Sequence, residues 1–308
     1  MSRCGMIPKL NASRLADWMY DNPRIPGNLE RWFKTCTYNQ LTFTKENNPI
    51  VEIDLPCQGT TEQKRAFDFK NGKGNGKNED NEVWGLGELA YSWLKQNYPF
   101  WAMEWGRYRK IFIYPYNWAT NYVQWSGLAV LGCNDKDLSL CYTWINTETS
   151  VTQLQMSIVV QELVHNVGLV HSSRKLFDRN QNKWVHCEYC DQQCPMGWGE
   201  AENNDKQLLC TNAAQSYKAG WAKPISGGHI NAFDLPPGVT QQFTLPSMHL
   251  SKDNMLRIIY DQWNRVVDGD TVHVIQDALF VSYRVRQNAS GAYDSGLSAP
   301  VNRRVWKQ

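Results

Sequence analysis

The chain of 308 residues lacks any apolar run approaching the ~20 residues that cross a bilayer, so we expect no membrane span. It also lacks long runs of like charge. Its 32 lysines and arginines balance 30 aspartates and glutamates, and the net charge of +2 indicates neither a nucleic-acid nor an anionic-membrane partner. The first twenty residues contain no apolar stretch that would direct secretion, so no signal peptide is visible, and we expect the chain to be either a processed or truncated form or not exported.

A helical pattern that contains candidate metal ligands and a candidate general base lies between Ser150 and His171, where the sequence reads SVTQLQMSIVVQELVHNVGLVH. Ser150 and Gln153 form a capping-box pattern, which predicts the start of a helix. Apolar residues then recur at helical spacing, at Met156, Val160, Leu163 and Val167. We therefore expect a helix with this face buried.

Three side chains of this stretch have the spacing of a metal site. Gln161 and His165 are four residues apart, so they project from the same helix face. Gly168 can take the left-handed conformation that ends a helix, which would let the chain reverse and bring in His171 as third ligand. Glu162 lies next to the first ligand, where a carboxylate can act as general base. The pattern predicts a three-ligand site with an open fourth position for water.

The same residues resemble the metal motif of the metzincin proteases, His-Glu-x-x-His-x-x-Gly-x-x-His, with glutamine replacing the first histidine. Downstream, Met196 lies in a Pro-Met-Gly context, and LLCTNAAQSYKAGW is typical of a helix ending near Gly220. With the Glu-Tyr-x-Asp of 188–191, this glutamine variant resembles the gametolysin family of green-algal cell-wall-degrading metalloproteases. Further similar segments are FKTCTYNQLTF, LPCQG, WSGLAVLGC and FVSYRVRQNASGAYDSGL.

The resemblance implies an α+β fold. A metzincin-like zinc protease domain over 1–224 would contain a mixed sheet, the active-site helix and a methionine turn at Met196. Glycine and asparagine at about 71–80 indicate a flexible loop in this domain. Alternating segments over 225–308 predict a small antiparallel, β-sandwich-like domain. Gly168 and Met196 would support the site. The implied cofactor is Zn²⁺, although another divalent metal is possible, and an amide oxygen ligand should lower metal affinity.

The implied function is a zinc-dependent endopeptidase that cleaves proteins and glycoproteins of an extracellular matrix or cell wall, with metal-activated water and Glu162 as general base. An alternative is a non-catalytic wall- or matrix-binding relative with a degenerate metal site. A metal-dependent hydrolase of non-peptide bonds has no feature in its favour. Fourteen tryptophans favour core packing over a polymer-binding groove.

The nine cysteines favour an oxidising compartment, so we expect an extracellular protein with at least one unpaired thiol. Asn11 and Asn288 are glycosylation acceptors on a secretory route. The pairings that we expect are Cys133 with Cys141 and Cys36 with Cys57.

Two cysteine segments allow a second interpretation. His186, Cys187, Cys190 and Cys194 have zinc-site spacing, but we favour disulfides that involve these cysteines and perhaps Cys210, because thiolates need reducing conditions. Cys4 lies in an Arg-Cys-Gly sequence similar to a cysteine switch, and we favour a structural disulfide there too.

Other elements follow from local patterns. We expect a helix over 82–98 and strands over 110–116, 127–132 and 141–145, and two strands around an Asn-Asn-Pro turn within 37–55. Either Asp191 or Asp178 is a candidate to orient a ligand imidazole.

Overall fold

The computed structural model describes the chain except residues 9, 72–79, 116–124, 147–153, 198, 200–204, 232–233, 260–264, 269–270, 275–277, 299–305 and 308. It shows a mixed α+β protein with several small sheets, as predicted. Two compact units form: residues 1–20 with 44–170, and residues 21–43 with 171–308. The domain division between residues 224 and 225 stays a prediction. None of the described helices is both long and apolar enough to cross a bilayer.

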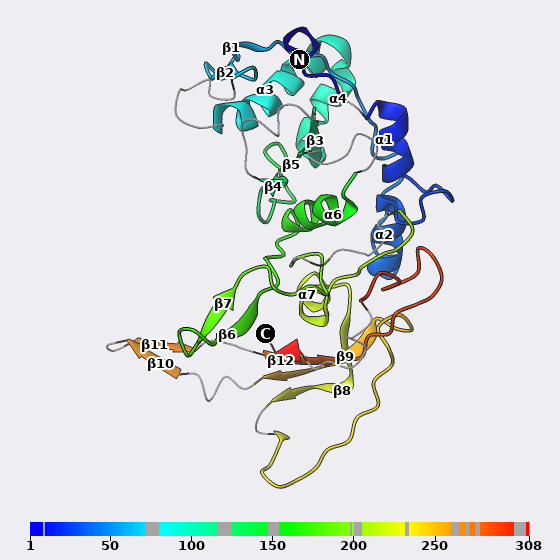
Figure 1. Ribbon diagram of the computed structural model, residues 1–308, viewed down its shortest axis with the longest axis vertical. Coiled ribbons are helices and arrows are strands. Elements are labelled where there is room, and N and C mark those ends of the chain that lie inside the picture. The colour runs from blue at the N-terminus through cyan, green and yellow to red at the C-terminus, as the bar shows by residue number, and fades with distance from the viewer. Residues whose placement is uncertain are drawn as a thin grey trace. The chain divides into compact units, whose positions relative to one another are not determined.

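The first unit contains a three-stranded sheet with helices packed around it (Figure 1). The strand order is β3-β5-β4, with β5 parallel to β3 and antiparallel to β4, and β1 and β2 form a separate antiparallel pair. The elements are η1 (Ser2–Cys4), α1 (Ala12–Met19), β1 (Gln58–Thr60), β2 (Ala66–Asp68), α3 (Asp80–Asn97), α4 (Pro99–Met103), η2 (Trp105–Arg107), β3 (Lys110–Tyr114), β4 (Gly127–Ala129), β5 (Tyr142–Asn146) and α6 (Met156–His165). The predicted helix and all three predicted strands of this region are therefore confirmed.

The central strand β5 is buried along its whole length, because β3 and β4 flank it and helices cover it. Helix α6 packs against β4 and β5. Its Met156, Val160 and Leu163 are buried as predicted, whereas Val167 is 40% exposed because the helix already ends at His165. The sheet thus fixes the helix that carries the candidate ligands.

Asn166, immediately after α6, joins this helix to the sheet. Its buried side chain accepts a hydrogen bond from Thr143 Oγ1 at 2.9 Å and donates to the carbonyls of Val130 and Tyr142 at 2.8 and 3.2 Å. The helix end is further held where Gly132 N donates to His165 O at 2.9 Å. These bonds give partners to the buried Asn166 amide and to the backbone carbonyl at the end of the helix.

One local structure expected from the sequence is wrong, and others lie outside the described residues. The two strands within 37–55 were predicted wrongly, since the structure has no strand there. Tyr38 and Asn39 both take positive φ, of 54° and 60°, which bends the backbone where an extended strand would start. The capping box of Ser150 and Gln153 and nearly all of the loop at 71–80 lie outside the described residues; the helix itself has Gln155 as its N-cap.

The second unit is built on a four-stranded sheet of order β13-β12-β9-β8. Its elements are α2 (Leu29–Cys36), β6 (Arg174–Asp178), β7 (Lys183–Cys187), α7 (Ala213–Lys218), β8 (Lys223–Asn231), β9 (Asp253–Ile259), β10 (Arg265–Asp268), β11 (Thr271–Val274), β12 (Ala278–Ser282) and β13 (Trp306–Lys307). Strand β8 runs parallel to β9, so the sheet is mixed, not purely antiparallel as expected. Strands β6 with β7 and β10 with β11 form separate hairpins.

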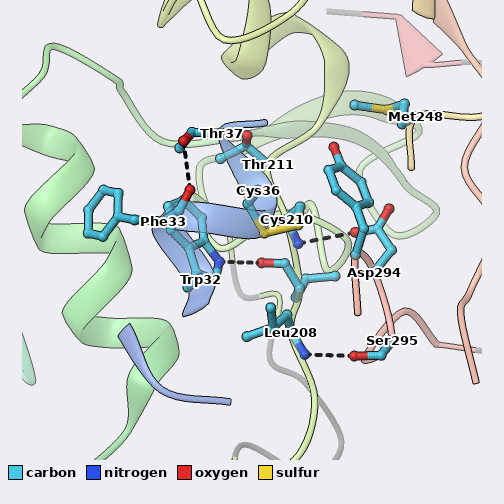
Figure 2. Close-up of a disulfide and its surroundings, with 12 residues drawn as sticks. Trp32, Phe33, Cys36, Thr37, Leu208, Cys210, Thr211, Met248, Asp294 and Ser295 are labelled. Carbon is cyan, nitrogen blue, oxygen red and sulfur yellow. Dashed lines mark hydrogen bonds between the residues drawn. A yellow bond between two sulfur atoms is a disulfide. The ribbon is translucent and has the colours of Figure 1, made fainter. Parts of the chain in front are cut away.

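A disulfide between Cys36 and Cys210 ties α2 to the chain before α7 (Figure 2). Around it, Trp32 Nε1 donates to Leu209 O at 2.9 Å, and Thr37 Oγ1 donates to Phe33 O at 2.6 Å. Segments far apart in the sequence therefore share one core.

The remaining cysteines form three disulfides and leave one thiol unpaired. Cys133 with Cys141 is confirmed, and Cys4 is in a disulfide as favoured, with Cys57. The pairing of Cys36 with Cys57 was wrong, because Cys36 faces Cys210 across the second unit. Cys187 pairs with Cys190, and Cys194 is the buried unpaired thiol, so its expected disulfide was also wrong.

A buried ion pair holds the same region of the second unit. Arg284 and Asp294 have 4% and 1% exposed side chains, and Arg284 Nε donates to Asp294 Oδ2 at 2.7 Å. The guanidinium also donates to the carbonyls of Gln193 and Cys210 at 2.6 and 2.9 Å, while Asp294 Oδ1 accepts from Cys210 N at 3.1 Å. One ion pair therefore positions two chain segments.

Arg284→Met is expected to lower the free energy of unfolding by about 3–5 kcal/mol, because it leaves the Asp294 carboxylate buried without its counter-charge. Urea denaturation monitored by near-UV circular dichroism measures this loss. The control is Arg109→Met, which removes an exposed ion pair with Asp135 and should change stability by less than about 1 kcal/mol. Equal losses of stability in the two variants would contradict a stabilising role for the buried ion pair of Arg284 with Asp294.

Candidate active site

Helix α6 carries three of the predicted site residues. Gln161 and His165 lie one turn apart on this helix and both are half-buried, whereas the side chain of Glu162 is only 5% exposed. The helix therefore presents the Gln161 amide and the His165 imidazole on one face. The buried carboxylate belongs to Glu162, the residue that follows Gln161 in the sequence. These positions agree with the helix expected from the sequence, and the roles of the three side chains stay a prediction.

The imidazole of His165 is oriented by the turn that follows it. Gly168 has φ of 87°, the left-handed conformation that was predicted, and Gly168 N donates to His165 O at 2.8 Å. The reversed chain brings Leu169 O to 2.7 Å from His165 Nδ1. Because a carbonyl only accepts, Nδ1 carries the proton, and Nε2 of the neutral ring carries the lone pair that binds a metal.

His171, in the second unit, is oriented in the same way by a carboxylate. Its Nδ1 lies 2.6 Å from Glu188 Oε1, and its ring lies 4.1 Å from the ring of Tyr189, measured between centroids. The carboxylate accepts a hydrogen bond from Nδ1–H, so in the neutral ring Nε2 again carries the lone pair. A carboxylate behind an imidazole is the usual arrangement around metal-binding histidines.

The two aspartates expected to orient an imidazole have other partners, so that expectation was wrong. Asp178 Oδ1 accepts from the backbone N–H groups of Asn180 and Gln181 in the turn between β6 and β7. Asp191 is buried and accepts from Asn212 Nδ2 at 2.9 Å and from Gln193 N at 3.0 Å. Asp191 therefore holds the start of α7.

The donor set fits a divalent metal such as zinc. Both imidazoles have the tautomer that places a lone pair on Nε2, and Gln161 adds a neutral amide oxygen. Within the described parts of the chain, no group of three or more His, Cys, Asp or Glu side chains could hold a metal. The predicted set has only two such residues, because its third member is a glutamine. The three ligands of this site stay a prediction.

Glu162 lies in an environment suited to proton transfer. Burial raises the pKa of its carboxyl group to about 7, because the charged form loses contact with water. A general base works best when its pKa is near the operating pH. The carboxylate packs against β4, where a Cβ atom on Gly127 would lie 2.5 Å from Glu162 Cγ and 2.8 Å from Oε1. Only glycine leaves room for this side chain.

Met196 lies in a turn directly linked to the residue after His171. The side chain is fully buried, and Gly197 N donates to Cys194 O at 2.9 Å to close the turn. Ser172 N donates to Met196 O at 2.7 Å. A Cβ atom at Gly197 would lie 2.2 Å from Asp191 O, so the glycine allows the close packing. The predicted role of Met196 in supporting the site stays a prediction.

Two residues that position the candidate site residues, Glu188 and Asn166, were not predicted from the sequence. Glu188 lies in the Glu-Tyr-x-Asp segment, which was used only as a family signature, although a carboxylate next to two cysteines could have suggested a supporting role. Asn166 directly follows His165, but a polar residue at a helix end gives no signal of the three hydrogen bonds it makes.

Gly127→Ala is expected to lower kcat for peptide hydrolysis at least about a hundredfold, because the new methyl group displaces the Glu162 carboxylate by a large fraction of an ångström. Steady-state kinetics and metal content, measured together, check this. The control is Gly106→Ala, whose Cβ would meet Asp137 Oδ1 at an ordinary 3.4 Å. Unchanged turnover in Gly127→Ala would remove Gly127 from the site.

Comparison with known proteins agrees with the motif. The family model described as Gametolysin peptidase M11 matches residues 1–307. Autolysin of Chlamydomonas reinhardtii is 28% identical over 196 residues, which cover 59% of this chain and 28% of that protein, so the match spans less than a third of the relative's length. No solved structure matches the chain. Because the family model covers almost every residue, the chain belongs to the gametolysin family of M11 peptidases.

Proposed function

We propose that the chain is a zinc-dependent endopeptidase that hydrolyses peptide bonds in proteins of an extracellular matrix or cell wall. Membership of a metallopeptidase family supports proteolysis in general. The observation that carries the specific proposal is the orientation of both histidines, since each holds its Nδ1 proton on an acceptor and directs a lone pair to Nε2.

In this proposal Gln161, His165 and His171 hold the metal through one amide oxygen and two Nε2 atoms. When bound, zinc supplies a Lewis acid that polarises a carbonyl group and lowers the pKa of water to about 7. Leu169 O and Glu188 Oε1 keep the two rings in the binding orientation. The glutamine is the weakest of the three donors, because a neutral amide is a poorer ligand than imidazole.

Glu162 is the proposed general base. Its carboxylate accepts the proton of the attacking water and then donates it to the leaving amine. Burial against Gly127 restricts the carboxylate to one position, which saves the entropy of orienting it during reaction. A pKa of about 7 lets the same group accept and release a proton near neutral pH.

The substrate is proposed to lie along β4, one of the two edge strands of its three-stranded sheet. An extended peptide can add to such an edge through backbone hydrogen bonds, while side-chain pockets select the sequence. Since Gly127 of β4 contacts Glu162, a peptide on this strand lies next to the base. The turn at Met196 would be the methionine turn of a metzincin-like fold, supporting the residues that follow His171.

The substrate class and location follow from the relative and from the cysteines. The name of the autolysin match indicates lysis of the producing organism's own material, and this chain would act on matrix or wall proteins in the same manner. Four disulfides favour an oxidising, extracellular compartment. The substrate class and the extracellular location are both part of the proposed function.

Glu162→Gln is expected to abolish cleavage of casein, by at least about a hundredfold in kcat, while metal remains bound, because the amide cannot accept the proton. Gel-based digestion with and without a chelator, together with elemental analysis, checks this. The control Glu46→Gln changes an exposed carboxylate and should act like the parent protein. Parent-like turnover in Glu162→Gln would exclude this residue as the base, and parent protein without chelator-sensitive activity would favour a non-catalytic relative.

Replacement of Gln161 tests the unusual ligand. Gln161→His should bind zinc at least as tightly as the parent, because imidazole is the better donor, whereas Gln161→Ala should lose at least about tenfold in affinity. Competition with a fluorescent zinc chelator measures the three dissociation constants. Identical constants would show that Gln161 is not a ligand.

A further inference from the structure

The hairpin of β6 and β7, here called the aromatic hairpin (residues 174–187), exposes two large aromatic rings. Phe177 and Trp184 are directly opposite in the antiparallel register, and their ring centroids lie 5.5 Å apart in an edge-to-face arrangement. The side chains are 46% and 67% exposed, whereas every other tryptophan with described burial is buried or half-buried. Two exposed rings held together on a pair of hydrogen-bonded strands are of the kind that is enriched at binding surfaces.

Basic side chains surround this aromatic pair. Lys175 and His186 form the next pair on the same face, since pairs two residues apart share a face, and both are exposed. Lys183 and Arg179 are exposed at the tip of the hairpin. The carboxylate of the hairpin, Asp178, accepts backbone hydrogen bonds in the tip turn. The surface therefore combines aromatic rings with an excess of positive charge.

The aromatic hairpin is joined at both ends to the residues that define one candidate ligand. His171 lies three residues before β6, and Glu188, which holds His171 Nδ1, directly follows β7. The disulfide of Cys187 and Cys190 brackets Glu188 and Tyr189, the two residues that contact the His171 ring. A substrate bound at His171 thus has the base of the hairpin beside it.

We propose that the aromatic hairpin binds an extended, acidic segment of the polypeptide substrate, outside the residues that flank the cleaved bond. This inference rests on the proposed protease function and names the substrate class of the same site. Trp184 and Phe177 pack against apolar parts of the segment, and Lys175, Lys183 and Arg179 attract its carboxylates. Charge complementarity selects the acidic segment, since a basic one would be repelled.

Binding is tested directly with the inactive Glu162→Gln protein and fluorescently labelled peptides of equal length that are acidic, neutral or basic. Fluorescence anisotropy should show about tenfold tighter binding of the acidic peptide than of the neutral one, with the preference decreasing as salt increases. Trp184→Ala and the double substitution Lys175→Glu with Lys183→Glu should each weaken acidic-peptide binding about tenfold. The controls are Phe100→Ala and Lys218→Glu, which alter an exposed ring and an exposed cation elsewhere.

Cleavage assays then separate this inference from the proposed function. With active enzyme, the ratio of kcat/KM for an acidic long substrate to that for a neutral one should decrease about tenfold in the hairpin variants and stay unchanged in the two controls. Equal ratios in all proteins would overturn the role of the hairpin while leaving the protease intact. Competition by a neutral oligosaccharide but not by the acidic peptide would also overturn it. If the parent protein cleaves nothing but still binds the acidic peptide, the protease proposal fails and the docking surface stands.

Discussion

The fixed Nδ1 protons of His165 and His171 are the constraint on which the candidate site depends. A histidine can bind a metal only through a nitrogen that carries a lone pair, and a hydrogen bond at the other nitrogen decides which one that is. A backbone carbonyl supplies this bond for one ring and a carboxylate for the other. The carbonyl is in reach because Gly168 takes a left-handed conformation, so the glycine of the motif has a defined physical task.

The buried carboxylate depends on a second glycine that lies in another element. Gly127 leaves the space that the Glu162 side chain occupies, and the resulting burial raises its pKa to about 7. An exposed glutamate would be fully ionised and a weak base at that pH. The environment of the proposed base is therefore formed by a helix and an edge strand, and the sheet that Asn166 joins to the helix holds the two in register.

The sequence predicted the helices, strands and turns that local spacing determines. It did not predict the contacts between segments that are far apart in the chain. The helix of 156–165, its buried face, three strands and the turn at Gly168 follow from periodicity and from glycine's conformational freedom. The partner of Cys36 is 174 residues away, and Glu188 reaches His171 only because a hairpin returns the chain, so neither contact leaves a periodic signal. The motif names candidate ligands, which stay a prediction, and it does not indicate which groups orient them.

The aromatic hairpin illustrates how one pair of strands can serve two purposes. Its ends must lie close together, since β6 and β7 pair along their whole length from Arg174 to Cys187. That closure brings Glu188 back to His171, and the disulfide of Cys187 with Cys190 limits how far the carboxylate can move. Because the strands are short, the rings of Phe177 and Trp184 stand only a few residues from this base. The hairpin that orients His171, a proposed ligand, therefore also presents the surface proposed to bind substrate, and a change in its register would disturb both.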